Sequence, residues 1–310
     1  MSLPPTLRVR VPASTSNLGP GFDQLGLALE LWLEVEVLGP SSGETHEWVR
    51  LEGEAASWPE ERNRLLLGLE AGLARQGAAV APLALAARSE IPLRRGLGSS
   101  GAAVAAGLLL GSALGGDPDP DRATLASLGT RLEGHPDNVT ASLIGGCTLG
   151  VPLADGELQV LTPPVHGSLH AAVAWPSTPL DTDDARRVLP ESVPLRDAVH
   201  ATRRLGLLLE GLRTGSAELL AAGAEDRLHT PFRLPLIAGA EAALAAARMA
   251  GAPLAAISGS GSALLALTPE PDTAQAAAEA LAAELRPHHP EVEQRVLALA
   301  HEGARLHPGS

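Results

Sequence analysis

The 310-residue chain carries 36 acidic and 23 basic side chains, and its formal net charge is −13. This acidic balance argues against a nucleic-acid-binding protein, because such proteins present a basic face to the phosphates. Hydrophobic residues make up 45% of the chain, which can therefore build a sizeable core, more readily as two domains than as one.

No signal for a membrane or a secretory route is visible in the sequence. Gly, Pro or charged residues interrupt every apolar run well short of the ~20 residues that cross a bilayer. The N-terminal residues lack the apolar segment of a signal peptide. We therefore expect a cytoplasmic protein without membrane contacts.

The residue types that are missing exclude several kinds of chemistry. All 23 basic side chains are arginine, so a Walker A lysine, a Schiff base and a catalytic ammonium group are excluded. The single cysteine, Cys147, excludes an internal disulfide and a thiolate zinc cluster, and its apolar surroundings favour a buried structural residue. No pair of histidines has helical metal-binding spacing, so we expect no structural zinc.

The first half of the chain alternates strand and helix patterns. Period-two alternation predicts strands, and 3.6-residue periodicity with caps and glycine stops predicts helices. Strands are expected over 7–11, 27–39 (one strand or a hairpin arm), 83–88 and 169–176. Helices are expected over 63–77 and 99–114, with another starting from the Asp-rich turn 117–121.

The second half is richer in helices. The break at 162–168 places a domain boundary near 165, which divides the chain into 1–165 and 166–310. Helices are expected over 195–215, 215–226, 238–252 and 272–285, with a strand–turn over 254–267 and a closing strand over 292–300. This order predicts an α/β or α+β fold with helices on one face of each sheet.

A glycine-rich turn at Arg94–Leu110, RRGLGSSGAAVAAGLLL, matches G-x-G-x-x-G. A dinucleotide site needs a strand that enters the first glycine directly, and an acidic residue at the end of a second strand. Here Pro92 lies between the strand and Gly96, and Asp117 lies in a turn. The context therefore disfavours a dinucleotide.

A glycine-rich loop that leads into an Ala-rich helix remains. Unpaired N–H groups and the helix dipole favour an anion at such a helix start. Ser99 and Ser100 add hydroxyls that can bind phosphate or Mg²⁺. A serine-capped helix after a tight turn explains this loop equally well when it is taken alone.

Six ordered segments shift this balance. The segment PLRRGLGSSGAA at 92–103 resembles the phosphate-binding motif of the GHMP small-molecule kinases. The segments VPASTSNLGPGFDQLGLAL at 11–29 and EGHPDNVTASLIGG at 133–146 resemble the homoserine kinase form of that superfamily. The segments DARRVLP and EDRLHTPFRLPLI resemble its substrate-side segments, and ISGSGSALLAL at 257–267 resembles its C-terminal glycine motif. Gly101, Ser260 and Ser262 depart from the usual pattern.

The resemblance implies an α+β, two-domain GHMP kinase fold. It consists of an N-terminal domain like the second domain of ribosomal protein S5 and a ferredoxin-like C-terminal domain, with the active site between them. It also implies a homodimer.

The resemblance further implies an ATP site and a magnesium site. Asn63 stands where the family contacts adenine, although helix capping is an equally good interpretation of this residue. Ser100 and Glu133 are the implied Mg²⁺ ligands. The implied ATP-binding residues are Asn63, Pro92, Leu93, Arg94, Arg95, Gly96, Leu97, Gly98, Ser99, Ser100 and Gly101.

The implied second substrate is L-homoserine, phosphorylated on its hydroxyl to O-phospho-L-homoserine in threonine biosynthesis. Arg186 and Arg233 would bind its carboxylate, and the neighbouring Arg187 is the alternative to Arg186. Asp23 would bind its ammonium group. The implied substrate contacts are completed by Asn17, His135 and Asn138.

The residues at the acceptor hydroxyl are Asp137, Asn138 and Arg186, the candidates for catalysis. Because a loose phosphoryl-transfer transition state builds little charge on the nucleophile, we expect no protein base, with Asp137 in reserve. The alternatives are a GHMP kinase for another small alcohol, such as mevalonate, and a non-catalytic nucleotide-binding module on the same fold.

Overall fold

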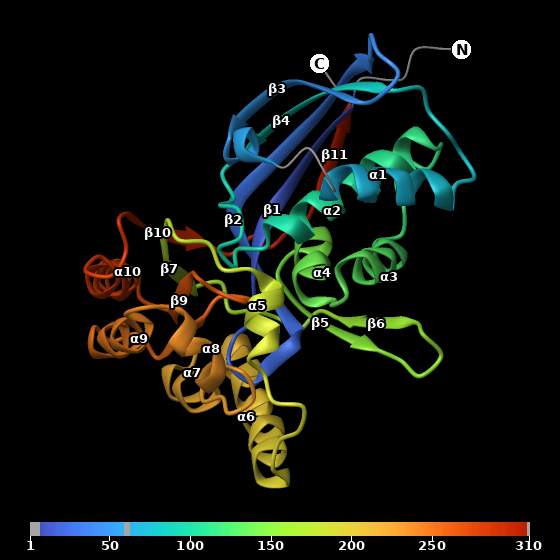
Figure 1. Ribbon diagram of the computed structural model, residues 1–310. Coiled ribbons are helices and arrows are strands. Elements are labelled where there is room, and N and C mark those ends of the chain that lie inside the picture. The colour runs from blue at the N-terminus through green and yellow to red at the C-terminus, as the bar shows by residue number, and fades with distance from the viewer. Residues whose placement is uncertain (1–6, 59–62, 309–310) are drawn as a thin grey trace.

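The computed structural model describes residues 7–58 and 63–308, which form two β-sheets flanked by helices (Figure 1). The larger sheet has the strand order β11-β1-β2-β4-β3, and β5 and β6 extend it from β2. The smaller, antiparallel sheet has the order β10-β7-β9-β8. The strands are β1 Leu7–Asn17, β2 Gly21–Pro40, β3 Glu47–Gly53, β4 Leu83–Ser89, β5 Cys147–Pro152, β6 Leu158–Leu161, β7 His170–Pro176, β8 Leu254–Ile257, β9 Leu264–Thr268, β10 Val292–Ala298 and β11 Arg305–Pro308.

The helices follow the two halves of the chain. Those that precede β7 pack near the larger sheet, whereas α7, α9 and α10 contact the smaller one and α6 packs on α7 (Figure 1). The α-helices are α1 Arg64–Arg75, α2 Ser99–Leu114, α3 Arg122–Glu133, α4 Asp137–Ile144, α5 Thr182–Arg187, α6 Leu195–Thr214, α7 Ala217–Gly223, α8 Thr230–Arg233, α9 Ala240–Met249 and α10 Pro271–Leu285. The 3₁₀ turns are η1 Glu54–Ser57 and η2 Leu234–Leu236.

The larger sheet has one buried face and one charged face. Val9 and Val35 face each other across β1 and β2 and are fully buried. The next pair along, Arg10 and Glu34, carries opposite charges and remains accessible. This period-two alternation turns the apolar side of the sheet toward the helices.

Helix α2 is apolar on every side and lies in the core. Its Gly107 and Gly111 let α1 approach so closely that an added Cβ would come within 2.0 Å of the Leu65 carbonyl oxygen and 2.2 Å of that of Leu69. This contact fixes the helix axis, and with it the position of the α2 N-terminus.

The two sheets share one hydrophobic core. It joins residues of β1 and β2 to Val173 and Leu265 of the smaller sheet and to Leu208 of α6. A second core fills the space between the smaller sheet and α9 and α10. The division near residue 165 stays a prediction, but one strand departs from it, because β11 pairs with β1 in the larger sheet.

The α+β, two-domain fold is confirmed, whereas several element bounds differ from expectation. The strand expected over 7–11 runs on to Asn17, and the one expected over 27–39 is part of a longer β2. Sequence patterns missed elements of four to eight residues, which are too short to show a clear periodicity, namely β3, β5, β6, β11, α4, α5 and α8. No helix in the described ranges is long and apolar enough to span a bilayer.

Candidate active site

The glycine-rich loop between β4 and α2 is held from behind by the smaller sheet's β8–β9 turn. Gly96 and Gly98 have φ angles of 77° and 73°, a conformation that favours glycine. A Cβ on Gly96 would lie 2.1 Å from the Ser258 carbonyl oxygen. The Ser258 hydroxyl donates to the Gly96 carbonyl oxygen (2.7 Å), and the Ala263 N–H donates to that of Arg95 (2.8 Å).

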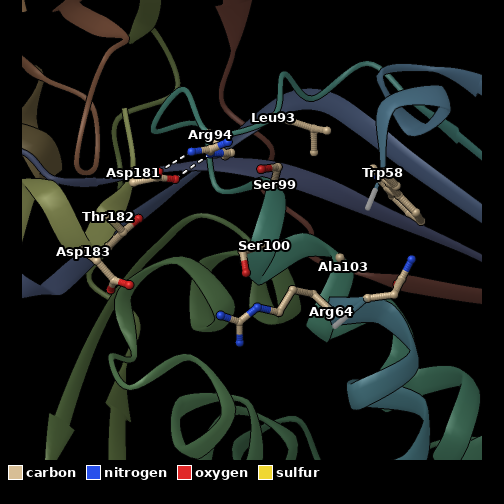
Figure 2. Close-up of a pocket in the computed structure, with 11 residues that line it drawn as sticks. Trp58, Arg64, Leu93, Arg94, Ser99, Ser100, Ala103, Asp181, Thr182 and Asp183 are labelled. Atoms are coloured by element: carbon tan, nitrogen blue, oxygen red, sulfur yellow. Dashed lines mark hydrogen bonds and ion pairs between the residues drawn. The ribbon is translucent and has the colours of Figure 1, made fainter. Parts of the chain in front are cut away.

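The first turn of α2 is open toward the solvent side of this loop. Its N-cap is Gly98, which supplies no side-chain hydrogen bond to the free N–H groups. Figure 2 shows Ser99 and Ser100 on this turn, facing a cavity. A 16-residue helix whose N-terminus is uncapped and opens into a cavity provides N–H donors and the positive end of a dipole for an anion.

Two cavities meet at this helix start. The first, of about 350 Å³, is lined by Trp58, Asn63, Arg64, Leu93, Arg94, Ser99, Ser100, Ala103, Asp181, Thr182 and Asp183 (Figure 2). The second, of about 200 Å³, is lined by Ser16, Asn17, Asp23, Arg64, Arg94, Gly96, Gly98, Ser99, Ser100, Gly101, Glu133, His135, Asp137, Asn138, Thr182, Asp183, Arg186, Arg233, Gly259 and Ser260. Ser99 and Ser100 border both, so a ligand on the helix start can extend into either cavity.

The far end of the first cavity is apolar. Leu93 and Ala103 line it together with Trp58, which packs edge-on against Trp48 with 5.4 Å between ring centroids. Asn63 lines the same cavity, but its side-chain oxygen accepts from the N–H of Leu65 at 3.0 Å and so caps α1. The sequence motifs did not single out Trp58, because an aromatic residue at the end of a 3₁₀ turn carries no motif signal.

Two oxygen donors lie beside the helix start. The Ser100 hydroxyl donates to Glu133 Oε1 at 2.8 Å, and the Glu133 side chain is only 5% exposed. Arg64 lies 3.4 Å from the same carboxylate oxygen. Ser100 and Glu133 thus fit a hard cation that takes its other ligands from phosphate and water. No group of three or more metal-ligating His, Cys, Asp or Glu residues occurs within 7–58 and 63–308.

The second cavity holds a concentration of opposite charges. Arg186 Nη1 and Nη2 donate to the two carboxylate oxygens of Asp23, each at 2.8 Å. Arg233 is 1% exposed, and its guanidinium donates to the carbonyl oxygens of Ala185 and Gly259 at 3.2 and 3.3 Å. Burial, and after it the charge of Arg186, lowers the pKa of Arg233.

The geometry separates the two candidate arginines of α5. Arg186 lines the second cavity, whereas Arg187 pairs with Asp184 at 2.6 Å and is 74% exposed. Asn17, with φ of 71°, joins the site through its amide, which donates to the Gly259 carbonyl oxygen at 2.7 Å and accepts from the Asp23 N–H at 2.9 Å.

The HPDN segment supplies a buried polar network. Asp137 is 2% exposed, and its Oδ1 lies 2.6 Å from His135 Nδ1 and accepts from the Asn138 N–H at 2.7 Å. Burial raises the pKa of Asp137, but the hydrogen bond and charge of His135, together with hydrogen bonds from Asn138 and Ser16, outweigh it and lower this pKa overall. The Asn138 amide accepts from the Ser14 hydroxyl at 3.0 Å and donates to the Ser16 hydroxyl at 2.9 Å.

Three of the residues expected to bind ATP line neither cavity. Leu97 is fully buried in the core, and Pro92, at the start of the same loop, is buried as well. Arg95 donates to the carbonyl oxygens of Pro176 and Leu93, both at 2.8 Å, and so braces the loop. Arg94 does line both cavities and pairs with Asp181 of the segment that starts α5 (Figure 2).

Family models match the chain in both halves. The N-terminal domain of the GHMP kinases matches residues 65–146, and their C-terminal domain matches residues 208–287. Curated homoserine kinases from Synechococcus sp. strain RCC307 and strain ATCC 27144 are 41% and 38% identical to the chain. They cover 89% and 97% of it, and 88% and 97% of their own lengths are matched.

The chain belongs to the homoserine kinase family of GHMP kinases.

Solved structures of other proteins share the fold of this GHMP kinase. A homoserine kinase from Cytophaga hutchinsonii ATCC 33406 superposes with a TM-score of 0.84 at 28% identity, with 97% of each chain covered. A putative homoserine kinase from Listeria monocytogenes gives 0.75 at 27%, with 98% of this chain and 100% of that chain covered. L. major mevalonate kinase, with a TM-score of 0.67 at 14% identity over 98% of this chain and 97% of that chain, shares the fold alone.

Proposed function

We propose that this GHMP kinase transfers the γ-phosphoryl group of ATP to the hydroxyl of L-homoserine and releases O-phospho-L-homoserine and ADP. The observation that carries the proposal is that the uncapped start of α2 borders a cavity of about 200 Å³ that is lined by acidic and basic side chains. The names of the relatives, at 41% and 38% identity, support the same substrate.

The first cavity suits the nucleotide. The phosphates would lie on the N–H groups and hydroxyls of Ser99 and Ser100, where the positive end of the α2 dipole favours negative charge. The base would extend toward the apolar end, where the Trp58 indole offers a ring for stacking. The cavity of about 350 Å³ falls within the range of small-molecule sites.

Mg²⁺ would be held by Ser100 and Glu133 together with phosphate oxygens. When bound, such an ion spreads the charge that develops on the transferring phosphoryl group. Arg64, now 3.4 Å from Glu133, is close enough to bind the phosphates when the Glu133 carboxylate turns to the cation.

The second cavity suits the zwitterionic head of an amino acid. Asp23 would accept from the ammonium group, and Arg186 and Arg233 would donate to the carboxylate. Arg233 makes no ion pair among the described residues, so its buried charge lacks an anionic partner. The carboxylate of the substrate would supply that partner. Mevalonate has a carboxylate but no ammonium group, and it would leave Asp23 unmatched.

The acceptor hydroxyl would lie next to Asn138, between the head-group pocket and the phosphates. Asp137 Oδ1 already faces His135, the Asn138 N–H and Asn138 Nδ2 (3.1 Å), and its lowered pKa makes the carboxylate a weak base. We therefore propose that no protein base removes the hydroxyl proton, which passes late to the transferring phosphoryl oxygen. Asn138 orients the hydroxyl with its amide.

Coupled ADP release tests the proposal. The purified chain with ATP and Mg²⁺ should release ADP rapidly with L-homoserine, and only at background rates with mevalonate or without an acceptor. Faster turnover of mevalonate would assign another alcohol, and no turnover with any acceptor despite ATP binding would indicate a non-catalytic module. Mass spectrometry of the product should show one added phosphate on homoserine.

We propose in addition that the enzyme works as a cytoplasmic homodimer. Light scattering on the purified protein should then give twice the mass of one chain, and a mass of one chain would reject the dimer.

A further inference from the structure

The ring of Phe22 lies close to two arginines that line the second cavity, although Phe22 does not line that cavity itself. The guanidinium carbon of Arg233 is 5.0 Å from the centre of its ring, and that of Arg186 is 5.9 Å away. Both distances are within the ~6 Å at which a cation is attracted to an aromatic ring. One ring therefore contacts both arginines that line this pocket.

The ring matters most for Arg233, because Arg186 is already paired with Asp23 through two hydrogen bonds. The charge of Arg186 lowers the pKa of Arg233, after the larger effect of burial. Asp23 accepts both hydrogen bonds from Arg186, so Arg233 is left with two backbone carbonyls and the Phe22 ring. The electron-rich ring stabilises a buried cation that has no carboxylate partner in the described ranges.

His229 holds the Phe22 ring in place from another side. Its ring stacks on Phe22 with 5.2 Å between centroids and an interplanar angle of 25°. His229 is fully buried, and its Nε2 lies 2.9 Å from the carbonyl oxygen of Gly19 in the turn between β1 and β2. Asp226 accepts from the N–H groups of Leu228, His229 and Thr230, which fixes the segment that carries His229.

This arrangement joins the β1–β2 turn to the helices that follow β7. Asn17 ends β1 and Asp23 lies near the start of β2, whereas α5 and α8 carry Arg186 and Arg233. Phe22, the second residue of β2, contacts His229 and both arginines with its ring.

We propose that Phe22 is a positioning residue for carboxylate recognition: its ring, held by His229, fixes the guanidinium groups of Arg186 and Arg233 in the direction that an α-carboxylate of the substrate requires. The inference rests on the proposed function, because it assigns the role within the homoserine pocket. It predicts that loss of the ring weakens the preference for a substrate with a carboxylate, and does not lower the affinity for all substrates alike.

The test compares L-homoserine with L-homoserine amide, in which a neutral amide replaces the carboxylate. The variant Phe22→Leu keeps apolar volume but removes the aromatic ring. We expect kcat/KM for homoserine to fall about 10- to 30-fold, mainly through KM, and kcat/KM for the amide to change less than about 2-fold. The KM for ATP should stay unchanged.

The sequence offers a matched control, since it contains only two phenylalanines. Phe232 precedes Arg233 but is 37% exposed, so Phe232→Leu should leave both substrates unaffected. Phe22→Tyr keeps the ring and should retain the wild-type selectivity for homoserine. If Phe22→Leu does not fold, the selectivity of Phe22→Met replaces it in the same comparison.

Equal losses for homoserine and its amide, or no loss for either, would overturn the proposal and leave the proposed function intact. Absence of homoserine turnover in the unmodified chain would instead reject the proposed function, and the role of Phe22 with it. Thermal unfolding of each variant shows whether a change in kcat reflects loss of folded protein.

Discussion

Asp23 and Arg186, 163 positions apart in the sequence, face each other through two hydrogen bonds of 2.8 Å each. Both side chains are 35% exposed, so the pair is partly accessible to a ligand from the cavity. Such a pair presents a negative and a positive group side by side, the inverse of an amino-acid head group.

Asp23→Asn should weaken homoserine binding with little cost in stability. Loss of a charged hydrogen-bonding partner should raise the KM for homoserine by about 10–100-fold, while the KM for ATP stays unchanged. The partly exposed pair contributes less than ~1 kcal/mol to folding. Steady-state kinetics and thermal unfolding measure both effects, and Asp184→Asn, which removes the partner of Arg187 outside the cavity, is the control.

Glu133→Gln should raise the Mg²⁺ concentration needed for half-maximal activity by about 10–100-fold, because an amide oxygen binds a hard cation less strongly than a carboxylate oxygen does. A magnesium titration at saturating ATP measures the change. Glu279→Gln, on the exposed side of α10, is the matched control. An unchanged magnesium requirement in Glu133→Gln would remove Glu133 from the metal site.

Gly101→Ala should lower kcat. An added Cβ would lie 3.0 Å from the Asn138 Cβ, 3.1 Å from the Val139 nitrogen and 3.2 Å from the Asn138 carbonyl carbon, so the start of α4 with Asn138 must shift by a few tenths of an ångström. Since ~1 Å of misplacement can cost ~10²-fold in rate, we expect a decrease of about 2- to 10-fold. Alanine also favours the helix by up to ~1 kcal/mol.

Gly206→Ala provides the comparison for Gly101→Ala. Gly206 lies in α6 with no atom within 4 Å of an added Cβ, so the same substitution should stabilise the helix and leave kcat unchanged. Full activity of Gly101→Ala would contradict the idea that this contact positions Asn138.

Asp137→Asn should retain kcat within about 10-fold if no protein base is used, because the amide oxygen can still accept from the Asn138 N–H. A general base contributes ~10²–10⁴-fold, so a decrease of that size would identify Asp137 as the base. Single-turnover kinetics at saturating substrates separates this step from binding. Thermal unfolding should show a loss of stability, because His135 loses a charged partner.

His229 should make the protein less stable in mild acid. Burial, the largest effect, lowers the pKa of His229 below its value in the unfolded chain. As the pH falls below ~6.5, the unfolded chain takes up a proton that the folded protein excludes, so stability decreases by up to ~1.4 kcal/mol per pH unit.

Urea unfolding at pH 7.5 and pH 5.5 measures this effect, with His229→Gln as the variant that cannot titrate. The variant should show a shallower loss of stability between the two pH values. His135 acts in the opposite direction. Although burial lowers its pKa, its hydrogen bond to Asp137 and the charges of Asp137 and Glu133 raise it overall. The difference between wild type and His229→Gln removes this common contribution.

The sequence by itself determined the family and predicted an anion site at the glycine-rich loop. The order of motifs predicted the two-domain fold, and the missing lysine left a helix start as the anion site, which the uncapped N-terminus of α2 supports. These features are local, because glycine spacing, helix periodicity and residue type act within a few residues of each other.

Tertiary structure decided what the motifs left open. Helix rotation at α5 turned Arg186 into the cavity and Arg187 to solvent, which a sequence cannot distinguish without its packing partners. The contacts that placed Trp58 in the first cavity, Arg95 against backbone carbonyls and Phe22 beside two arginines join segments distant in sequence. Their energy depends on burial and distance, which exist only after the chain has folded.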